Sequence, residues 1–272
     1  MPELPEVQTV VQTLAPHAVG KVIWEINVHR PDVVRPMHVN LARKSIGRRI
    51  VSIARRGKQI IWTLEDGNRF VIHLGMSGRL TLEPADSGLA PHTHVVIHVG
   101  NSVQRTRQIR FRDPRRFGGV WWIGSEEPAG AMGPEPLTMK TGELVKRLGK
   151  TTRAIKNALL DQHLIAGLGN IYVDESLFEA GIHPLARADK LSVEQITRLN
   201  RAIKAVLKRA LKHRGSTLRD YRDADGTAGG FQSLHRVYGR TDQPCHTCKR
   251  PLKRIVIGGR STHFCPRCQT RS

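Results

Sequence analysis

The chemistry-bearing residues with the clearest spacing in this sequence are its four cysteines, which lie close together near the carboxyl end. Their pattern is Cys245-x2-Cys248-x16-Cys265-x2-Cys268. Each CxxC pair can direct two thiolates to one tetrahedral zinc ion, and the residues between the pairs suffice for a β-hairpin that turns at Gly258-Gly259. Because four sulfur ligands leave no open coordination position, we predict one structural zinc ion and no catalytic one.

The predicted hairpin is strongly basic. A segment this short has almost no core of its own, so the metal is expected to supply its fold. We expect the hairpin to hold Arg260 rigidly against a phosphate, and the alternative is a solvated basic turn with no ligand. Its cationic residues are Lys249, Arg250, Lys253, Arg254 and Arg260.

A second candidate centre is the amino terminus, which reads Met1-Pro-Glu-Leu-Pro-Glu6. Removal of Met1 would leave Pro2 with a free secondary amine, and free α-amines titrate near ~7.7–8.0, so part of the amine is neutral at physiological pH. Attack of that amine on a sugar carbon would give an iminium ion, which supports later elimination of phosphates. Glu3 and Glu6 are one helical turn apart and could act as general acid and base. Pro-Glu is equally ordinary at the start of a helix, and these residues alone do not decide between the two interpretations.

The composition indicates a polyanionic partner. The chain has 272 residues, with 44 Lys+Arg against 23 Asp+Glu and a formal net charge of +21. Such a charge opposes folding by self-repulsion, whereas a nucleic acid gains from it because each neutralised phosphate releases a counterion. No stretch reaches the ~20 apolar residues of a membrane span, and no secretory signal is visible, so we expect a monomer in the cytosol or nucleoid with no membrane partner.

The pattern of elements predicts an α+β protein with two domains. An amphipathic helix over residues 1–20 should lead into an antiparallel β-sandwich, because the strands that follow are short, rich in Val and Ile and broken by turn residues. Further helices follow over 152–162, over 171–180 and after a capping box at Ser192-Val-Glu-Gln195. Residues 215–230 read as a mobile glycine-rich loop. The predicted strands are 22–28, 59–64, 70–74, 95–99, 109–112 and 119–123.

We place the domain borders at composition changes. The segments are a β-sandwich catalytic domain over 1–127, a proline-rich linker over 128–140, a helical domain over 141–239 and the four-cysteine zinc finger over 240–272. The histidines at 92, 94 and 98 could suggest a second metal site, but ordinary loop and strand positions explain them better.

Taken together, the sequence resembles the bacterial formamidopyrimidine-DNA glycosylases, which repair 8-oxoguanine and also act as apurinic/apyrimidinic lyases. The matching stretches run through nearly the whole chain in the family's order. They are Met1–Val7, Arg56–Lys58, His73–Gly78, Asp113–Gly118, Gly133–Leu137, Gly167–Tyr172, Ala180–Pro184, Val237–Arg240 and Gly259–Cys265.

The resemblance implies a role for each matching residue. Pro2 would be the Schiff-base nucleophile, Glu3 its acid/base partner and Glu6 a supporting carboxylate. Lys58 would reach the phosphate and damaged nucleotide, while Asn170, at a helix start within the family's helix-two-turn-helix, and Arg260 would clamp phosphates. A base taken out of the stack leaves a gap, and the residues that would fill it are Met76, Arg115 and Phe117, with Arg115 facing the orphaned cytosine. Further candidates for DNA contact are His94, Lys156, Arg219 and Tyr238; Arg219 stands where some relatives have lysine.

The resemblance therefore implies excision of oxidised purines from duplex DNA through a Schiff base, followed by β,δ-elimination, with one structural Zn²⁺ and no organic cofactor. Two alternatives stay open. An endonuclease VIII-type enzyme for oxidised pyrimidines would share the nucleophile and the zinc site, although Leu4 replaces the glycine typical of that branch. A non-catalytic zinc-ribbon protein that binds DNA would explain the charge and the cysteines equally well.

Overall fold

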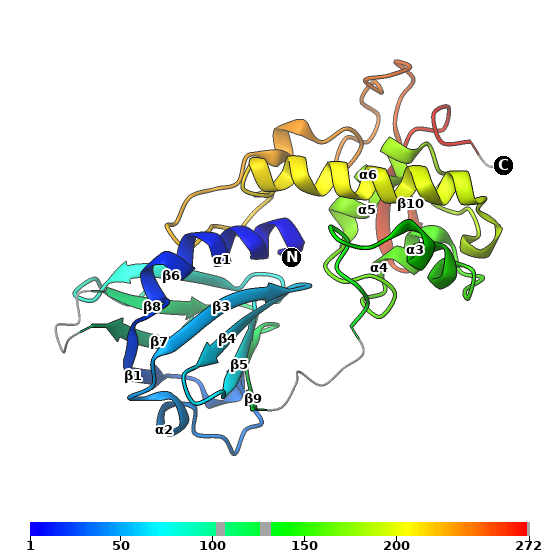
Figure 1. Ribbon diagram of the computed structural model, residues 1–272. Coiled ribbons are helices and arrows are strands. Elements are labelled where there is room, and N and C mark those ends of the chain that lie inside the picture. Colours follow the sequence, from blue (N-terminus) through cyan, green and yellow to red (C-terminus); the bar gives the residue numbers. More distant parts are fainter. Residues whose placement is uncertain (102–106, 126–131, 271–272) are drawn as a thin grey trace. The chain divides into compact units, whose positions relative to one another are not determined.

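The computed structural model describes residues 1–101, 107–125 and 132–270 (Figure 1). The chain divides into two compact units, which are described separately here. The first comprises residues 1–130 and 213–230, and the second comprises 131–212 and 231–272. The predicted linker over 128–140 lies partly outside the described residues, as do the last two residues of the predicted zinc finger.

The first unit contains two β-sheets that share one core. The four-stranded sheet has the order β1-β7-β8-β6, and the five-stranded sheet has the order β2-β9-β5-β4-β3. The strands are β1 (Val22–Val28), β2 (Val34–Arg35), β3 (Ile50–Arg56), β4 (Gln59–Leu64), β5 (Arg69–His73), β6 (Arg79–Pro84), β7 (Thr93–Gly100), β8 (Arg107–Arg112) and β9 (Gly119–Gly124). All pairings are antiparallel except the short parallel pair of β2 and β9, so the predicted antiparallel sandwich is confirmed apart from that pair.

Two helices and a 3-10 turn complete this unit. They are α1 (Leu4–Ala18), η1 (Pro31–Val33) and α2 (Leu41–Ser45). The predicted leading helix is confirmed, although it begins at Leu4 and Glu3 is its N-cap residue. Its apolar face, which includes Val7, Val10 and Leu14, is fully buried in the core formed by side chains of both sheets. Gly20 ends the helix region with φ +80°, a backbone conformation that glycine adopts without strain.

The second unit is helical and carries the predicted hairpin. Its elements are α3 (Thr141–Leu148), α4 (Ile155–Leu160), α5 (Asn170–Ala180), η2 (Ala188–Lys190), α6 (Val193–Lys212), η3 (Phe231–Leu234), β10 (Lys253–Ile257) and β11 (Arg260–Phe264). The capping box that was predicted to open α6 is confirmed: Ser192 N donates to Gln195 Oε1 over 2.8 Å, and Gln195 N donates to Ser192 Oγ over 3.2 Å.

The hairpin of β10 and β11 turns where the sequence predicts. Ile257 pairs with Arg260, so Gly258 and Gly259 form a two-residue turn with φ +55° and +73°. Positive φ at both positions is what a type I′ hairpin turn requires. Within the described part of the chain, no helix has the length and apolar character needed to cross a bilayer.

Candidate functional site

The amino end of α1 holds two buried carboxylates beside Pro2. Glu3 and Glu6 are 2% and 1% exposed, and Pro2 is also buried. The Glu3 backbone N–H donates to Glu6 Oε2 over 2.8 Å, which is half of a capping box. In the full-length chain the Pro2 nitrogen is bonded to Met1, so its use as an amine requires removal of that residue.

The second Glu6 oxygen holds a segment that is distant in sequence. Ser216 N donates to Glu6 Oε1 over 2.7 Å, and the Tyr221 hydroxyl donates to the Glu6 carbonyl over 3.3 Å. Gly215 has φ +76°, and a Cβ atom there would lie 2.6 Å from Glu6 Oε1, so both the conformation and the close approach require glycine. One buried carboxylate thus ties the amino end of α1 to the segment 213–230.

The segment 213–230, which contains the predicted mobile loop over 215–230, has a buried side that packs on α1. Tyr221 and Ala224 belong to the core of the first unit, and Ala224 N donates to Thr13 Oγ1 over 3.1 Å. Burial, and then the nearby Glu6 charge, raise the pKa of the Tyr221 hydroxyl. Arg219 is exposed at the tip of this segment. The segment therefore combines an anchored base with an exposed tip.

Lys58 lies in the turn between β3 and β4, two strands against which α1 packs. Its side chain is 8% exposed. The pKa of the neighbouring His73 is lowered, mainly by burial and then by the positive charge of Lys58. His73 Nδ1 accepts the Gly75 N–H over 3.0 Å, as a neutral imidazole can. The Lys58 ammonium group is therefore poorly solvated by water, but it can still approach an anionic phosphate of a partner.

The three side chains predicted to fill a base gap are all exposed on two neighbouring loops. Met76 and Phe117 are 42% and 56% exposed, which is unusual for side chains of this size. The Arg115 guanidinium lies 4.7 Å from the centre of the Phe117 ring. The structure therefore leaves these three side chains available to a partner.

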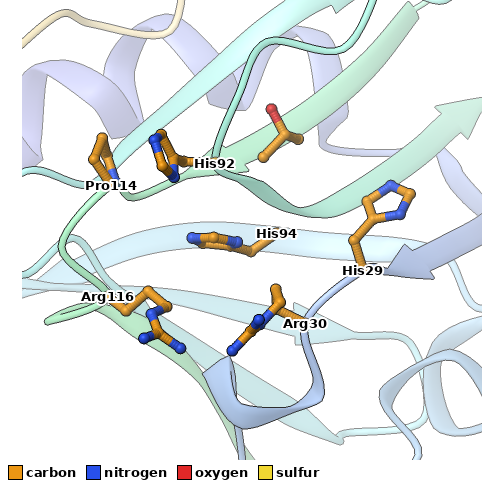
Figure 2. Close-up of a pocket in the computed structure, with 7 residues that line it drawn as sticks. His29, Arg30, His92, His94, Pro114 and Arg116 are labelled. Carbon is orange, nitrogen blue, oxygen red and sulfur yellow. The ribbon is translucent and has the colours of Figure 1, made fainter.

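A pocket of about 520 Å³ is lined by the predicted DNA-binding histidine, His94, and by His29 and His92, for which the sequence predicted no DNA contact (Figure 2). His94 is 5% exposed, and its Nε2 atom is 2.8 Å from the Asp113 carbonyl oxygen. His92 is exposed and has φ +66°, a strained conformation for a residue other than glycine. Arg30 and Arg116 line the same pocket, and each forms an ion pair with Asp32. His92 and His29 are therefore the exposed histidines of this pocket, and His94 is its buried one.

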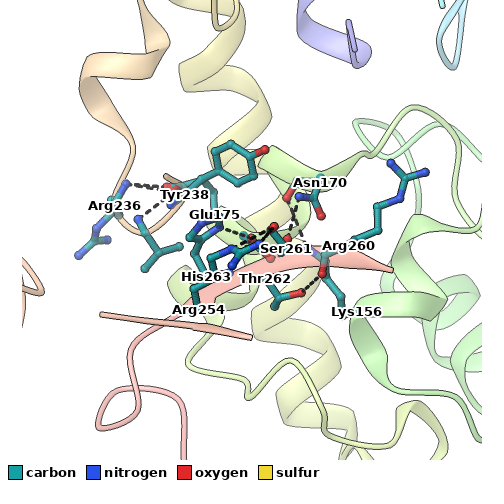
Figure 3. Close-up of polar contacts among 12 residues, drawn as sticks. Lys156, Asn170, Glu175, Arg236, Tyr238, Arg254, Arg260, Ser261, Thr262 and His263 are labelled. Carbon is teal, nitrogen blue, oxygen red and sulfur yellow. Dashed lines mark hydrogen bonds and ion pairs between the residues drawn. The ribbon is translucent and has the colours of Figure 1, made fainter. Parts of the chain in front are cut away.

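In the second unit, Asn170 and Lys156 contribute to one polar network (Figure 3). Asn170 is the first residue of α5, as predicted, and its Nδ2 atom donates to the Ser261 carbonyl over 2.8 Å. Lys156 is fully buried, and its Nζ atom lies 2.5 Å from Asp174 Oδ1. Asp174 Oδ2 also accepts the His263 N–H over 2.9 Å. Helices α4 and α5 and the hairpin strand β11 are thus held together by buried polar contacts.

Lys156→Met is expected to lower the free energy of unfolding of the zinc-loaded protein by about 3 kcal/mol, because it leaves the buried Asp174 carboxylate without its cation. Arg153→Met is a matched control, since the Arg153–Asp161 ion pair is largely exposed and should contribute well under about 1 kcal/mol. Urea denaturation measures both, and an equal loss in the two variants would contradict a structural role for the Lys156 charge.

A second buried carboxylate on α5 holds the segment that carries Tyr238. Glu175 accepts hydrogen bonds from the backbone N–H groups of Arg236, Val237 and Tyr238 over 2.8–3.1 Å. Burial nevertheless raises the pKa of this carboxyl. The Tyr238 ring makes an edge contact with the His263 ring, with centroids 5.0 Å apart. Residues 236–238 and the hairpin of β10 and β11 are therefore both held by carboxylates of helix α5.

Arg260 begins β11, and its side chain is exposed beside this network (Figure 3). Within the described part of the chain, Arg260 makes its hydrogen bonds through its backbone: Thr262 Oγ1 donates to the Arg260 carbonyl over 3.2 Å. A Cβ atom on Gly258 would lie 2.7 Å from Asn157 Oδ1, so the hairpin turn packs closely on α4. The hairpin thus presents Arg260 from a well-supported strand.

The four predicted zinc ligands meet at one point. Their sulfur atoms lie within 4.8 Å of one another; Cys248 Sγ is 3.4 Å from Cys265 Sγ, and Cys245 Sγ is 3.9 Å from Cys268 Sγ. A tetrahedral zinc ion with Zn–S bonds of about 2.3 Å requires sulfur separations of about 3.8 Å, so the cysteines fit that ion. The four cysteines hold one structural zinc ion. Because they take up its four coordination positions, no position remains for a reacting group.

Fold and site together define an α+β protein in which a β-sandwich with buried amino-terminal carboxylates is joined to a helical unit bearing a zinc finger. Family models match three stretches: the formamidopyrimidine-DNA glycosylase N-terminal domain over residues 1–120, the H2TH domain of the same glycosylases over 132–222, and the zinc finger found in FPG and IleRS over 242–271. The chain belongs to the formamidopyrimidine-DNA glycosylase family, whose members are DNA repair glycosylases. The family resemblance is thereby confirmed.

Similar proteins match over their whole length. The formamidopyrimidine-DNA glycosylase of Bacillus subtilis is 43% identical over 280 residues, covering 100% of both chains, and that of Gluconobacter oxydans is 44% identical, covering 99% of this chain and 100% of the relative. Among solved structures, the MutM (Fpg) protein from Thermus thermophilus is 40% identical with a TM-score of 0.88, covering 98% of both chains. The Lactococcus lactis Fpg in complex with abasic-site DNA is 36% identical with a TM-score of 0.91, covering 99% of this chain and 100% of that chain.

Proposed function

We propose that this protein excises oxidised purines, 8-oxoguanine and formamidopyrimidines, from duplex DNA and then cleaves the strand as a lyase. The observation that carries the proposal is the amino end of α1, where Glu3 and Glu6 are buried beside Pro2 and Glu6 is held by both Glu3 and Ser216. Lactococcus lactis Fpg has been solved with Fapy-dG-containing DNA and with abasic-site DNA, which supports the substrate and the intermediate proposed here.

The Pro2 amine, once Met1 is removed, would attack C1′ of the damaged nucleotide. The glycosidic bond breaks as the new C–N bond forms, and the base leaves with the bonding electrons and takes up a proton. The Pro2 nitrogen then loses its proton, the C1′–O4′ ring bond breaks as O4′ takes up a proton, and an iminium ion links Pro2 to the opened sugar. Glu3 is placed to exchange the protons of this step, and Lys58 would hold the adjacent phosphate. Loss of a proton from C2′ then expels the 3′ phosphate. Loss of a second proton, from C4′, expels the 5′ phosphate, and water hydrolyses the iminium bond to release Pro2.

The companion roles are proposals of the same kind. Met76, Arg115 and Phe117 would fill the gap left by the extruded base, and Asn170 and Arg260 would hold phosphates. We revise two further assignments in view of their burial: His92, with its exposed ring, replaces His94 as the DNA-contacting histidine, and Lys156 acts through Asp174. Tyr238 and Arg219 are retained as partly or fully exposed candidates.

Trapping the covalent intermediate tests the reaction. The mature protein should form a borohydride-stable adduct with 8-oxoguanine duplex, and acylation of its amino terminus should abolish that adduct. Release of 8-oxoguanine should also exceed release of thymine glycol, because an endonuclease VIII-type enzyme would prefer the oxidised pyrimidine. An adduct that persists after acylation would exclude Pro2 as the nucleophile.

Arg260→Ala is expected to weaken binding to damaged and undamaged duplexes almost equally and to reduce the slope of log K against log [salt] by about one, the value for one lost phosphate contact. Lys253→Ala removes one positive charge from the neighbouring strand of the same hairpin and serves as the control. Fluorescence anisotropy over a range of salt concentrations measures both slopes. Equal slopes for wild type and Arg260→Ala would remove the proposed phosphate contact.

A further inference from the structure

Two loops of the first unit, 74–78 and 113–118, carry Met76, Arg115 and Phe117. The first loop connects β5 to β6 and the second connects β8 to β9, so each passes from one sheet of the sandwich to the other. Strands β5 and β9 are neighbours in one sheet, and β6 and β8 are neighbours in the other. The topology therefore brings both loops to the same end of the sandwich.

One buried carboxylate connects these loops. Asp113 is fully buried, and its Oδ1 atom accepts the Ser77 hydroxyl over 2.6 Å and the Arg115 N–H over 3.3 Å. Its Oδ2 atom accepts the Gly118 N–H over 2.8 Å. Ser77, the residue directly after Met76, is 4% exposed. A single side chain thus binds the neighbour of Met76, the backbone of Arg115 and the residue after Phe117.

The loop backbones also touch directly. Gly75 has φ +60°, and a Cβ atom there would lie 2.4 Å from the Gly118 nitrogen. Arg116 keeps φ +53° although it is not glycine, and its N–H donates to the Asp113 carbonyl over 3.2 Å. A strained residue of this kind persists only where its surroundings determine the conformation. Asp113 supplies those surroundings, because its carbonyl accepts the Arg116 N–H and its carboxylate accepts the Arg115 N–H.

We propose that Asp113 is a positioning residue which, through Ser77, locks the two loops into one platform, so that Met76, Arg115 and Phe117 enter the gap in the duplex together. This inference rests on the proposed function. Filling a base gap is costly if the inserted side chains must first be ordered, and a platform ordered in advance removes that cost. In the first loop every residue except Met76 is buried, and in the second loop Asp113 and Gly118 are buried, so the exposed side chains project from an anchored backbone.

Two substitutions distinguish the hydrogen bond between the two loops from the hydrogen bonds within the second loop. Asp113→Asn retains the size of the side chain, but an amide accepts hydrogen bonds on one atom only, whereas the carboxylate accepts on both. Ser77→Ala removes the bond between the loops and leaves the bonds within the second loop. Asp66→Asn is the matched control, because Asp66 accepts hydrogen bonds within another turn of the same unit, from Asn68 and Arg48.

We expect kcat/KM for 8-oxoguanine excision from duplex to fall about 100-fold in Asp113→Asn and about tenfold in Ser77→Ala, and to change less than twofold in Asp66→Asn. Cleavage at a preformed abasic site should fall less than threefold in every variant, because no base has to be extruded. Wild-type-like excision by both Asp113→Asn and Ser77→Ala would overturn the proposal that the two loops form one platform. Absence of excision by the wild type would instead overturn the proposed function.

A double-substitution cycle distinguishes positioning from general weakening of the fold. If Ser77 acts through Met76, Ser77→Ala should have no further effect on excision in a Met76→Ala background. A further tenfold loss in that background would contradict the coupling. Should Asp113→Asn fail to fold in thermal melts, the Ser77→Ala and Met76→Ala cycle still decides the question, since Ser77 contributes a single side-chain bond to the loops.

Discussion

Protein that retains residues ahead of Pro2 is expected to give no borohydride adduct and to lose excision by on the order of 10³-fold or more. Insertion of lysine between Met1 and Pro2 achieves this, because methionine is not removed before a large residue and the proline nitrogen stays an amide. An amide has no free electron pair for attack on C1′. The duplex should still bind within about threefold, because the other contacts are unchanged.

Intact mass measurement must accompany this comparison. Active wild-type protein should lack Met1, whereas the insertion variant should keep it. Glu3→Gln gives a useful contrast, since it leaves the amine free and removes a proton-exchanging group, so it should slow excision and still allow slow trapping. Active preparations in which every molecule carries Met1 or a blocking group would rule out the mechanism.

Cys248→Ser is expected to weaken duplex binding by about 100-fold or more and to lower the stability of the whole second unit. Loss of one thiolate weakens the zinc site that folds the hairpin. The hairpin carries more than Arg260: Ser261 accepts from Asn170, and His263 is bonded to Asp174, the partner of Lys156. Its loss would therefore leave Asn170 unsupported and a buried ion pair partly exposed.

The first unit should stay folded in that variant, because its core has its own sheets and helix. Trp62 and Phe70 stack in that core with ring centroids 5.2 Å apart, so near-ultraviolet circular dichroism reports on it. Zinc content is measured alongside. His246→Ser is a matched control within the knuckle, since His246 is exposed and is not among the four ligands. Complete unfolding of the first unit would show that the units depend on each other for stability.

The sequence predicts an element correctly where both of its faces are buried or where its buried residues recur at a regular spacing. β1 and β4 have the predicted bounds, and β7 and β8, which are interior strands, differ by one or two residues at their ends. The missed strands β2, β3 and β6 all lie at sheet edges. An edge strand is unpaired along one side and can shift register there, as β3 does between Ile50 and Ser52, so its apolar and basic residues show no clear alternation. The short helices α2 and α3 were missed because five and eight residues carry little periodic signal.

The candidate site was predictable where a residue has its own chemical signature. Cysteine spacing identified the zinc ligands, whereas the amino-terminal proline beside two glutamates was assigned as the candidate nucleophile through the family resemblance. The buried supporting carboxylates Asp113, Asp174 and Glu175 were missed, since an isolated acidic residue has no pattern in sequence and only the fold shows what it binds. Lys156 and His94 illustrate the same limit: the family resemblance implied a DNA contact for each, and only the fold shows that both side chains are buried.

The contact between Glu6 and Ser216 spans 210 residues and sets an order of events during synthesis. At about 5–20 residues per second, the ribosome needs about 10–40 s after Glu6 emerges before its partner is made. During that interval the first turn of the chain lacks the contact that completes it, and a processing enzyme can reach Met1. Once the later segment arrives, Pro2 lies buried in the finished protein. Met1 itself stays 44% exposed in the finished protein, so under the proposed mechanism a molecule that keeps it is inert until that residue is trimmed.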